Sequence, residues 1–585
     1  MSAHPLRSPP VQPEPPPPAL SLLAHEPHEL LAAGRNCLAA GQLNDAETLF
    51  RAAAMRRPAD PETRYRLASA LIALGRLGDA QLALADAREL HARLMVQTHA
   101  ADLNPSDLSQ VARTAEVFYA NHLMAAASHL HQQVVAAKPD DPQAWVALGL
   151  ALQHQGRAEE SVAVFEAAVR RWPQSAGLHS FLVYARMFRQ ETPQTNYDEG
   201  RRWQAAHAEG LPRMPTRAPR REGKLRIGYY APLFNRHQMT HFFRPAFEHH
   251  DRSRFELVIY SGAEATDECG AAIKAGADLW RDVTKLGDQA FAEQVAADGI
   301  DILVDLWGHT AGNHLTMFAR KPAPIQVSWI NYIETTGLTA FDHVLHADNY
   351  NLDGAQSLFS ETIRPVGPVL APFRPPHDLP PPGPTPALSG APFTFASFVH
   401  PGKVTLEVVR VWAIILANAP NAVLTLRYSY FKDPAIRRSL HAQFEAFGIP
   451  AERILFGPHE TGEAFLRAYQ TADLVLDPFP YQGMTTTMDA LVAGVPVLTY
   501  EGARMNERIA ATSLRVCGLD ALVANDLDDY VARAVAFAGD PAALDAIRQS
   551  VRPAFDASPY RDEAGFTKRL EAEYEAMVAA WWAGA

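Results

Sequence analysis

Glycine and hydroxyl residues gather in one short segment of this 585-residue chain, residues 475–499. The apolar run that opens the segment predicts a strand, Gly483 lets the backbone approach a ligand, and Thr485 and Thr486 stand where a helix begins. The first N–H groups of a helix lack partners within it, and the positive end of the helix dipole attracts anions. The segment therefore predicts a seat for a diphosphate at Gly483, Thr485, Thr486 and Thr487. The alternative is that a threonine only caps the helix.

Two charged residues are expected beside this seat. Lys403 follows the predicted strand FTFASFV in the motif FVHPGK, and an ammonium there would stabilise the charge on a departing nucleoside diphosphate. Asp489 lies six residues after Gly483, where its carboxylate can hydrogen-bond a sugar or a loop amide. The alternatives are a solvated surface lysine and an aspartate that only complements the helix dipole.

A third strand end supplies a weaker candidate site for a nucleobase. The loop of residues 457–460 contains Pro458, and the helix after it carries Phe465 and Arg467. Stacking on Phe465 and hydrogen bonds from the loop backbone would hold a base there.

Two histidines, His237 and His241, occupy a loop that follows the strand LRIGYY. His237 is predicted as a general base or orienting group, and a surface or capping role is the alternative. The run HQMTH has the spacing of a zinc-binding helix, but Gln238 replaces the glutamate that a metalloprotease uses as base, so we expect no metal. His309, at another strand end, is a further cleft candidate.

The elements that would position these residues alternate between strand and helix from Lys224 onward. Six apolar runs predict a first lobe, a proline-rich crossing at residues 371–392 follows, and five more runs predict a second lobe. Two parallel sheets of this kind bind ligands at the carboxyl ends of their strands. The candidate residues all stand at such ends.

The first third of the chain is an internal repeat with a period of 34 residues, the period of tetratricopeptide repeats. Small, large and proline positions recur together in four copies, with Gly41, Gly75 and Gly156 at the turn between the helices of a pair. About 13 extra residues near 91–103 lengthen a helix or form a loop. The concave face of such a solenoid can hold an extended peptide, and the alternative is a scaffold or dimerisation arm.

Composition narrows the classes of partner. A net charge of −12 gives no overall basic surface on which nucleic-acid binding could rest, which leaves a local basic patch as the alternative. No run of apolar residues is long enough to cross a membrane. Three isolated cysteines and the absence of a secretory signal are consistent with a cytoplasmic protein. Residues 1–22 are rich in proline and are predicted to be a disordered leader.

Taken together, these motifs resemble the O-linked N-acetylglucosamine transferase and SPINDLY family. The likeness lies in RIGYYAPLFNRHQMTH, RKPAPIQVSWINYIETTGLTAFDH, ILFGP and ADLVLDPFPYQGMTTTMDALVAGVPVLT. It implies an α-solenoid followed by a GT-B glycosyltransferase with two Rossmann-like α/β lobes. The implied domains are a solenoid at residues 23–215, an N-terminal lobe at 216–375, and a nucleotide-sugar-binding lobe with closing helices at 376–585.

The resemblance also implies chemistry. The chain would be an inverting, metal-independent enzyme that transfers N-acetylglucosamine from UDP-GlcNAc to serine and threonine hydroxyls of proteins, with no cofactor. His237 matches the family's cleft histidine, which acts as base or orients the donor, and Lys403 matches its diphosphate-binding lysine. The donor site would be formed by His400, Gly483, Met484, Thr485, Thr486, Asp489, Pro458 and Phe465.

Several positions depart from the family pattern. His400 replaces the usual glutamine three places before the lysine, Phe465 replaces a base-contacting histidine, and Gln238 follows His237 in place of proline. GDP-fucose, which plant SPINDLY-type relatives use, is therefore an alternative donor. A catalytically silent repeat protein and a glycosyltransferase for small or lipid-linked acceptors are two further hypotheses for the chain.

Overall fold

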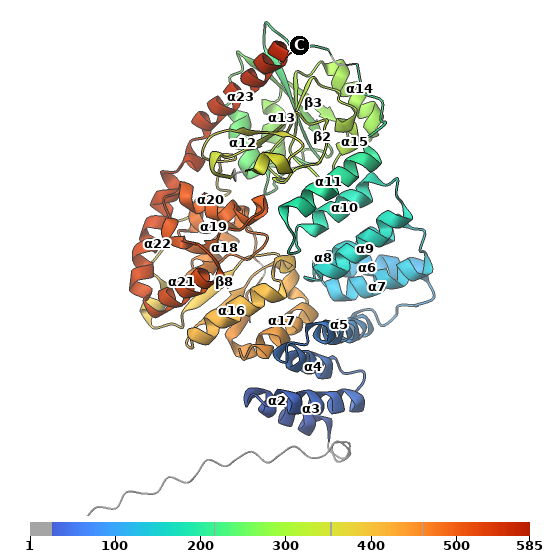
Figure 1. Cartoon of the computed structure of the whole chain (residues 1–585), viewed down its shortest axis with the longest axis vertical. Coiled ribbons are helices and arrows are strands. Elements are labelled where there is room, and N and C mark those ends of the chain that lie inside the picture. The colour runs from blue at the N-terminus through green and yellow to red at the C-terminus, as the bar shows by residue number, and fades with distance from the viewer. Residues whose placement is uncertain (1–25, 216, 351–353, 459, 585) are drawn as a thin grey trace, which may run out of the picture. The chain divides into compact units, whose positions relative to one another are not determined.

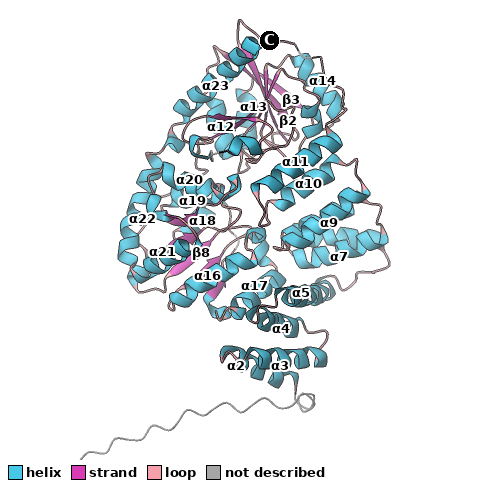
Figure 2. Cartoon of the chain, in the orientation of Figure 1, coloured by secondary structure: helices cyan, strands magenta, loops and turns pink. Residues whose placement is uncertain are grey.

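The computed structural model describes residues 26–215, 217–350, 354–458 and 460–584, so the predicted leader at 1–22 lies outside the described residues. The chain forms two compact units, Met1–Ala101 with Ala435–Ala451, and Asp102–Pro434 with Glu452–Ala585. Figure 2 shows that the chain contains far more helix than strand and that the strands are confined to the second unit. No helix in the described ranges is both long and apolar enough to cross a membrane.

The first unit consists of two helix pairs of the repeat and one helix from much later in the chain. Its helices are α2 (Pro27–Ala39), α3 (Leu43–Arg56), α4 (Pro61–Ala73), α5 (Leu77–His99) and α17 (Pro434–Ala446). The Ser69 hydroxyl donates to the Ala442 carbonyl oxygen at 2.9 Å, and Arg438 pairs with Glu62 at 2.6 Å. These contacts join α17 to α4. The extra residues near 91–103 lengthen α5 to 23 residues.

The second unit begins with three further helix pairs (Figure 1). They are α6 (Leu108–Ala120), α7 (Met124–Ala137), α8 (Pro142–Gln153), α9 (Ala158–Arg171), α10 (Ala176–Arg186) and α11 (Pro193–His207). The repeat prediction is confirmed, and its small positions have a steric cause. A Cβ on Gly149 would lie 2.4 Å from the Phe165 ring, so only glycine lets α8 approach α9 this closely.

The first lobe holds a parallel sheet of order β3-β2-β1-β4-β5-β6-β7. Its strands are β1 (Leu225–Ala231), β2 (Phe255–Ser261), β3 (Leu279–Asp282), β4 (Ile302–Asp305), β5 (Ile325–Ser328), β6 (His343–His346) and β7 (Thr362–Pro365). Its helices are α12 (Thr240–Glu248), α13 (Glu268–Gly276), α14 (Asp288–Asp298) and α15 (Leu315–Ala319). The central strands are buried, as their apolar runs predict.

The second lobe repeats this topology in the order β10-β9-β8-β11-β12-β13, again parallel. Its strands are β8 (Thr394–Ser397), β9 (Val423–Leu426), β10 (Ile454–Phe456), β11 (Leu474–Leu476), β12 (Val497–Tyr500) and β13 (Val523–Ala524). Its helices are α16 (Leu406–Asn418), α18 (Gly462–Tyr469), α19 (Thr485–Ala493), α20 (Ile509–Val516), α21 (Leu527–Gly539) and α22 (Pro541–Asp556). The two-lobed α/β prediction is confirmed.

The last helix, α23 (Glu563–Gly584), returns to the first lobe. The Phe566 ring stacks on Trp329 with centroids 6.0 Å apart, and the Tyr574 hydroxyl lies 3.2 Å from that of Tyr229 on β1. The end of the chain therefore covers the first sheet, although it follows the second lobe in sequence (Figure 1).

Candidate active site

Each sheet has a point where its strand order reverses, and three of the candidate residues lie at these two points. In the first sheet the loops after β1 and β4 flank the reversal, and in the second the loops after β8 and β11 do so. Neighbouring loops diverge there and leave a crevice, which is where open α/β sheets bind nucleotides. His237 follows β1, Lys403 follows β8, and Gly483 follows β11.

Lys403 ends a short 3₁₀ turn, η4 (Pro401–Lys403), and reaches across to the loop after β11. Its Nζ donates to the Gln482 carbonyl oxygen at 2.8 Å and lies 3.9 Å from the centroid of the Tyr481 ring. Burial lowers the pKa of Lys403 to about 8, and the nearby Asp477 carboxylate opposes that shift. The structure thus brings the predicted ammonium and the predicted diphosphate seat together.

Helix α19 begins at Thr485 without a side-chain cap. Within the described ranges, the backbone N–H groups of Thr485 and Thr486 have no partner, whereas the Thr487 hydroxyl donates to the Gly483 carbonyl oxygen at 2.8 Å. A Cβ on Gly483 would lie 2.1 Å from the Thr486 Oγ1. Glycine is required because the turn folds onto its own threonine. Met484, the residue that precedes the helix, is half-buried.

The buried side chain of Asp477 fixes this turn through hydrogen bonds. Its Oδ1 accepts from the Gly483 N–H at 2.9 Å and its Oδ2 accepts from the Thr499 hydroxyl at 2.8 Å. Burial raises the pKa of Asp477, while these two donors and Lys403 oppose the shift. Asp305, at the end of β4, accepts the N–H groups of Trp307 and Gly308 in the same way. Both lobes therefore fix the loop beside the strand-order reversal with a buried aspartate.

Asp489, in the second turn of α19, is only 7% exposed. Its carboxylate makes no hydrogen bond to any residue that the structure describes, and burial raises its pKa to about 7. A buried carboxylate without a donor is costly, so the expected loop amide does not explain its presence. A ligand hydroxyl remains as the predicted partner.

His237 packs its ring 5.1 Å from that of Trp307, on the loop after β4. Its Nδ1 accepts from the Met239 N–H at 3.2 Å, and burial lowers its pKa, so the ring is neutral. A neutral imidazole that accepts at Nδ1 carries its proton on Nε2. The Nε2 edge of His237 is therefore a hydrogen-bond donor.

The other two histidines lie differently. His241 belongs to α12, its carbonyl oxygen accepts from the Arg374 N–H at 3.0 Å, and burial lowers its pKa to about 4. His309 is 1% exposed, and its ring nitrogens bond the Ser180 hydroxyl and the Thr336 carbonyl oxygen. The interpretation of His309 as a cleft residue is wrong, because it joins α10 to the first lobe.

The remaining donor-site candidates lie around the second sheet. Phe465 is half-buried with its ring 5.8 Å from that of Phe398, the residue that follows β8. Pro458 is exposed after β10, and His459 beside it is outside the described residues. His400 opens η4, and its Nδ1 accepts from the Gly402 N–H at 2.9 Å. Within the described ranges, no cluster of three or more histidine, cysteine or carboxylate side chains can hold a metal ion.

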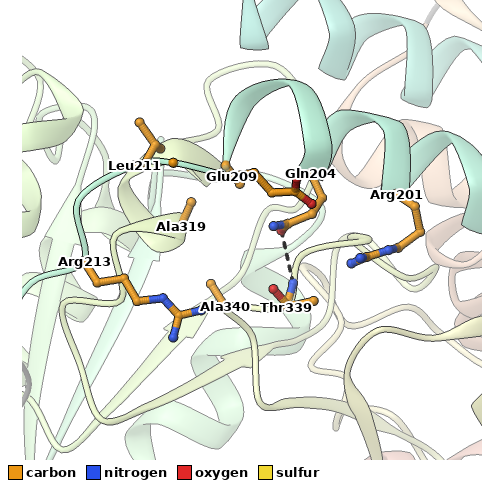
Figure 3. Close-up of a pocket in the computed structure, with 10 residues that line it drawn as sticks. Arg201, Gln204, Glu209, Leu211, Arg213, Ala319, Thr339 and Ala340 are labelled. Atoms are coloured by element: carbon orange, nitrogen blue, oxygen red, sulfur yellow. Dashed lines mark hydrogen bonds between the residues drawn. The ribbon is translucent and has the colours of Figure 1, made fainter.

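A separate cavity of about 250 Å³ lies between α11 and the first lobe (Figure 3). Gln204, Arg201 and Arg213 face it, and the Gln204 Oε1 accepts from the Thr339 N–H at 3.2 Å. The cavity contains none of the candidate residues, so its size does not identify the active site.

Three residues of the site are not predicted from the sequence, because only the fold brings them next to Lys403 and His237. Tyr481 and Gln482 contact the lysine, and Trp307 covers the histidine, yet their types carry no charge that would mark them. Their place in the loops after β11 and β4 is the sequence signal that could have identified them.

Comparison with known proteins gives separate matches for the repeats and for the two lobes. Residues 204–362 and 388–570 match the model for glycosyl transferase family 41, and residues 38–98 and 116–176 match tetratricopeptide-repeat models.

Curated relatives include a barley protein (Hordeum vulgare) named as a probable UDP-N-acetylglucosamine–peptide N-acetylglucosaminyltransferase SPINDLY. It is 36% identical over 360 residues, which cover 60% of this chain and 38% of the relative. A probable transferase of the same activity named SEC, from Arabidopsis thaliana, is 30% identical over 385 residues, 63% of this chain and 38% of the relative. The chain spans about two fifths of the length of these relatives.

Among solved structures, a mutant O-GlcNAc transferase of Thermobaculum terrenum superposes with a TM-score of 0.75 at 27% identity. The match covers 97% of this chain and 99% of that one. The likeness thus extends over the repeats and both lobes.

Proposed function

The chain belongs to glycosyl transferase family 41 and is a glycosyltransferase of the O-GlcNAc transferase and SPINDLY type, and on this premise we propose that it transfers N-acetylglucosamine from UDP-GlcNAc to protein serine and threonine hydroxyls. The observation that carries the proposal is the meeting of Lys403 with the turn before α19, at 2.8 Å from Nζ to the Gln482 carbonyl oxygen.

The diphosphate of the donor would lie between this ammonium and the start of α19. The acceptor oxygen attacks the anomeric carbon from the opposite face as the bond to the diphosphate breaks, which inverts the configuration. Negative charge grows on the departing phosphate, and the Lys403 ammonium and the N–H groups of Thr485 and Thr486 stabilise it. These donors supply the positive potential that a divalent cation supplies in other transferases.

His237 would orient a reactant by donation from Nε2. Its tautomer is fixed by the Met239 N–H, so the Nε2 is a donor and not a base in the neutral ring. Of the two roles considered for this residue, the geometry favours orientation. The proton of the acceptor hydroxyl then passes to an oxygen of the departing diphosphate or to water, so the products are the glycosylated hydroxyl and UDP.

The proposal also specifies where the acceptor would bind and which sugar would be transferred. An extended acceptor segment would lie along the repeats and place its hydroxyl in the crevice. GDP-fucose remains the second candidate donor, because Phe465 stands where the animal enzymes of the family that the motifs resemble carry a base-contacting histidine.

The test is to incubate the purified chain with UDP-GlcNAc or GDP-fucose and a panel of serine- and threonine-containing peptides. Mass spectrometry of the peptides would detect the added sugar, and calorimetry would compare UDP with GDP. Transfer from UDP-GlcNAc is the expected result. Transfer only from GDP-fucose would replace the donor, and failure to bind either nucleotide would favour a catalytically silent interaction protein.

A further inference from the structure

Two histidines and a tyrosine connect the helical repeats to the turn that carries Lys403. The His400 Nε2 lies 2.6 Å from the His154 Nδ1, and the His154 Nε2 lies 2.8 Å from the Tyr119 hydroxyl. Tyr119 belongs to α6, His154 follows the last residue of α8, and His400 opens η4. The chain of contacts therefore runs from two repeat helices into the loop after β8.

The order of donors and acceptors along this chain is fixed at its start. The Gly402 N–H donates to the His400 Nδ1, so a neutral His400 carries its proton on Nε2. That proton is donated to the His154 Nδ1, which places the His154 proton on Nε2, directed at the Tyr119 oxygen. Burial lowers the pKa of His154 to about 4 and that of His400 well below its ordinary value, so both rings are neutral.

Packing around the chain leaves little freedom to the turn. The His154 ring stacks on Tyr430 with centroids 4.5 Å apart and an angle of 25°. A Cβ on Gly156 would lie 3.0 Å from the Pro401 carbonyl oxygen, and one on Gly402 would lie 3.0 Å from the Gln153 carbonyl oxygen. The end of α8 and the turn η4 thus touch through their backbones, and the imidazole pair is the directional link between them.

We propose that His154, a residue of the repeat region, is a positioning residue for the transferase centre, acting through His400 on the turn that aims the Lys403 ammonium. This inference rests on the proposed function, since it concerns the position of the ammonium that stabilises the departing diphosphate. Lys403 stands three residues after His400, and the Gly402 N–H between them is the group that His400 accepts. Loss of the His154 acceptor would leave the His400 Nε2–H without its partner and free the ring to turn away from Gly402.

The experiment compares His154→Phe with His154→Gln, and His131→Phe serves as the matched control. Phenylalanine keeps the ring that stacks on Tyr430 but has neither nitrogen. Glutamine loses the ring but offers one acceptor and one donor. His131 is a buried histidine of α7, 3% exposed, whose Nε2 has no hydrogen-bond partner among the described residues.

We expect His154→Phe to lower kcat by about 10- to 100-fold with little change in the affinity for the intact donor UDP-GlcNAc measured by calorimetry, because misplacement of the ammonium is felt mainly as charge grows on the departing phosphate. We expect His154→Gln to retain more of kcat than His154→Phe, and His131→Phe to match the wild type. If the ring had a purely structural role, His154→Phe would retain more kcat than His154→Gln, since phenylalanine preserves the packing. Equal kcat in His154→Phe and His131→Phe would overturn the inference.

Failure of the proposed function is a different result. If the wild-type chain binds UDP but transfers no sugar, the function is wrong and the inference is judged on ¹⁵N spectra of histidine-labelled protein. Both His154 and His400, assigned by their loss in the variants, should then show a protonated Nε2 and an unprotonated Nδ1. Averaged shifts from exchanging tautomers would refute the chain.

Discussion

At Lys403, burial favours the neutral amine, whereas the proposed catalysis needs the charged ammonium. The low-dielectric surroundings disfavour its charge, and the proposed chemistry requires that charge. A neighbouring diphosphate would restore the protonated form, so the site is adapted to the complex and not to the empty crevice. This opposition leads to two expectations.

Replacing the lysine should separate chemistry from folding. Lys403→Met is expected to lower kcat by about 10²- to 10³-fold, since the charge on the departing phosphate loses its main counter-charge. The melting temperature should not fall, because a partly buried charge is removed. Lys432→Met changes an exposed lysine of the same lobe and is the control, with unchanged kcat. Retained turnover in Lys403→Met would refute the role of the ammonium.

The pH dependence follows from the same residue. Because the folded pKa is about 8 and the ordinary value is 10.5, the ammonium of the free enzyme is lost as pH rises through about 8, and kcat/KM for the donor should fall there. The unfolded chain still binds the proton between these values, so this group makes the free energy of unfolding rise with pH over that window. Activity and stability should therefore change in opposite directions between pH 8 and 10. The stability difference from Lys403→Met isolates the contribution of the lysine.

Asp489 is expected to show a trade-off between stability and binding. Its folded pKa is about 7 and its ordinary value is 3.8, so the folded chain holds the extra proton between them and the free energy of unfolding falls as pH rises from about 4 to 7. Asp489→Asn should stabilise the chain by about 1 kcal/mol or more at pH 8, with little gain at pH 4, and weaken UDP binding by about 10-fold. Melting curves at both pH values and calorimetry would measure this. Tighter UDP binding in the variant would contradict a ligand contact.

At this scale the sequence predicts the position of a residue that stands in its own turn, and it does not predict a contact whose partner is distant in the chain. Lys403 and Gly483 were predicted from the strands that precede them, and the structure brings them together. His309 is a weaker candidate at another strand end, and the structure shows its Nδ1 hydrogen-bonded to the Ser180 hydroxyl of α10. No local pattern contains that contact, because the two residues are 129 positions apart.

Among the elements, the turn before α19 depends on the absence of a side chain. Gly483 does not have a positive φ, so its requirement is steric and not conformational. The Thr486 hydroxyl occupies the space that a Cβ would fill. The strand, turn and helix are therefore predictable from the sequence, whereas the reason for the glycine is not.

Gly483→Ala should displace the start of α19 and weaken UDP binding by about 10-fold or more, with the fold retained, because the Cβ would meet Thr486 at 2.1 Å. Gly177→Ala is the matched control, since a Cβ there meets no atom within 4 Å and the residue lies in α10. Calorimetry with UDP and a melting curve would be measured for both variants. Equal UDP affinity in the two would show that the turn does not hold the nucleotide.

On the scale of the whole molecule, two helices pack against elements that are distant from them in the sequence. Helix α17 follows β9 of the second lobe but packs on α4 of the first unit, and α23 ends the chain but covers the first sheet. Periodicity predicts that such helices exist and have an apolar face, but it does not name the surface that the face covers. The order of elements was thus predictable, and these two long-range pairings were not.

The return of α23 makes the stability of the first lobe depend on the last residues of the chain. Phe566 is fully buried and stacks on Trp329, so Phe566→Ala should cost about 3–5 kcal/mol and shift the unfolding of the first lobe to lower urea. Glu575→Ala, on the same helix, removes only a surface ion pair with Arg254 and should cost less than about 1 kcal/mol. Because Trp329 lies under α23, its fluorescence would contribute to the signal for that transition. A midpoint equal to that of Glu575→Ala would mean that the first lobe holds together without α23.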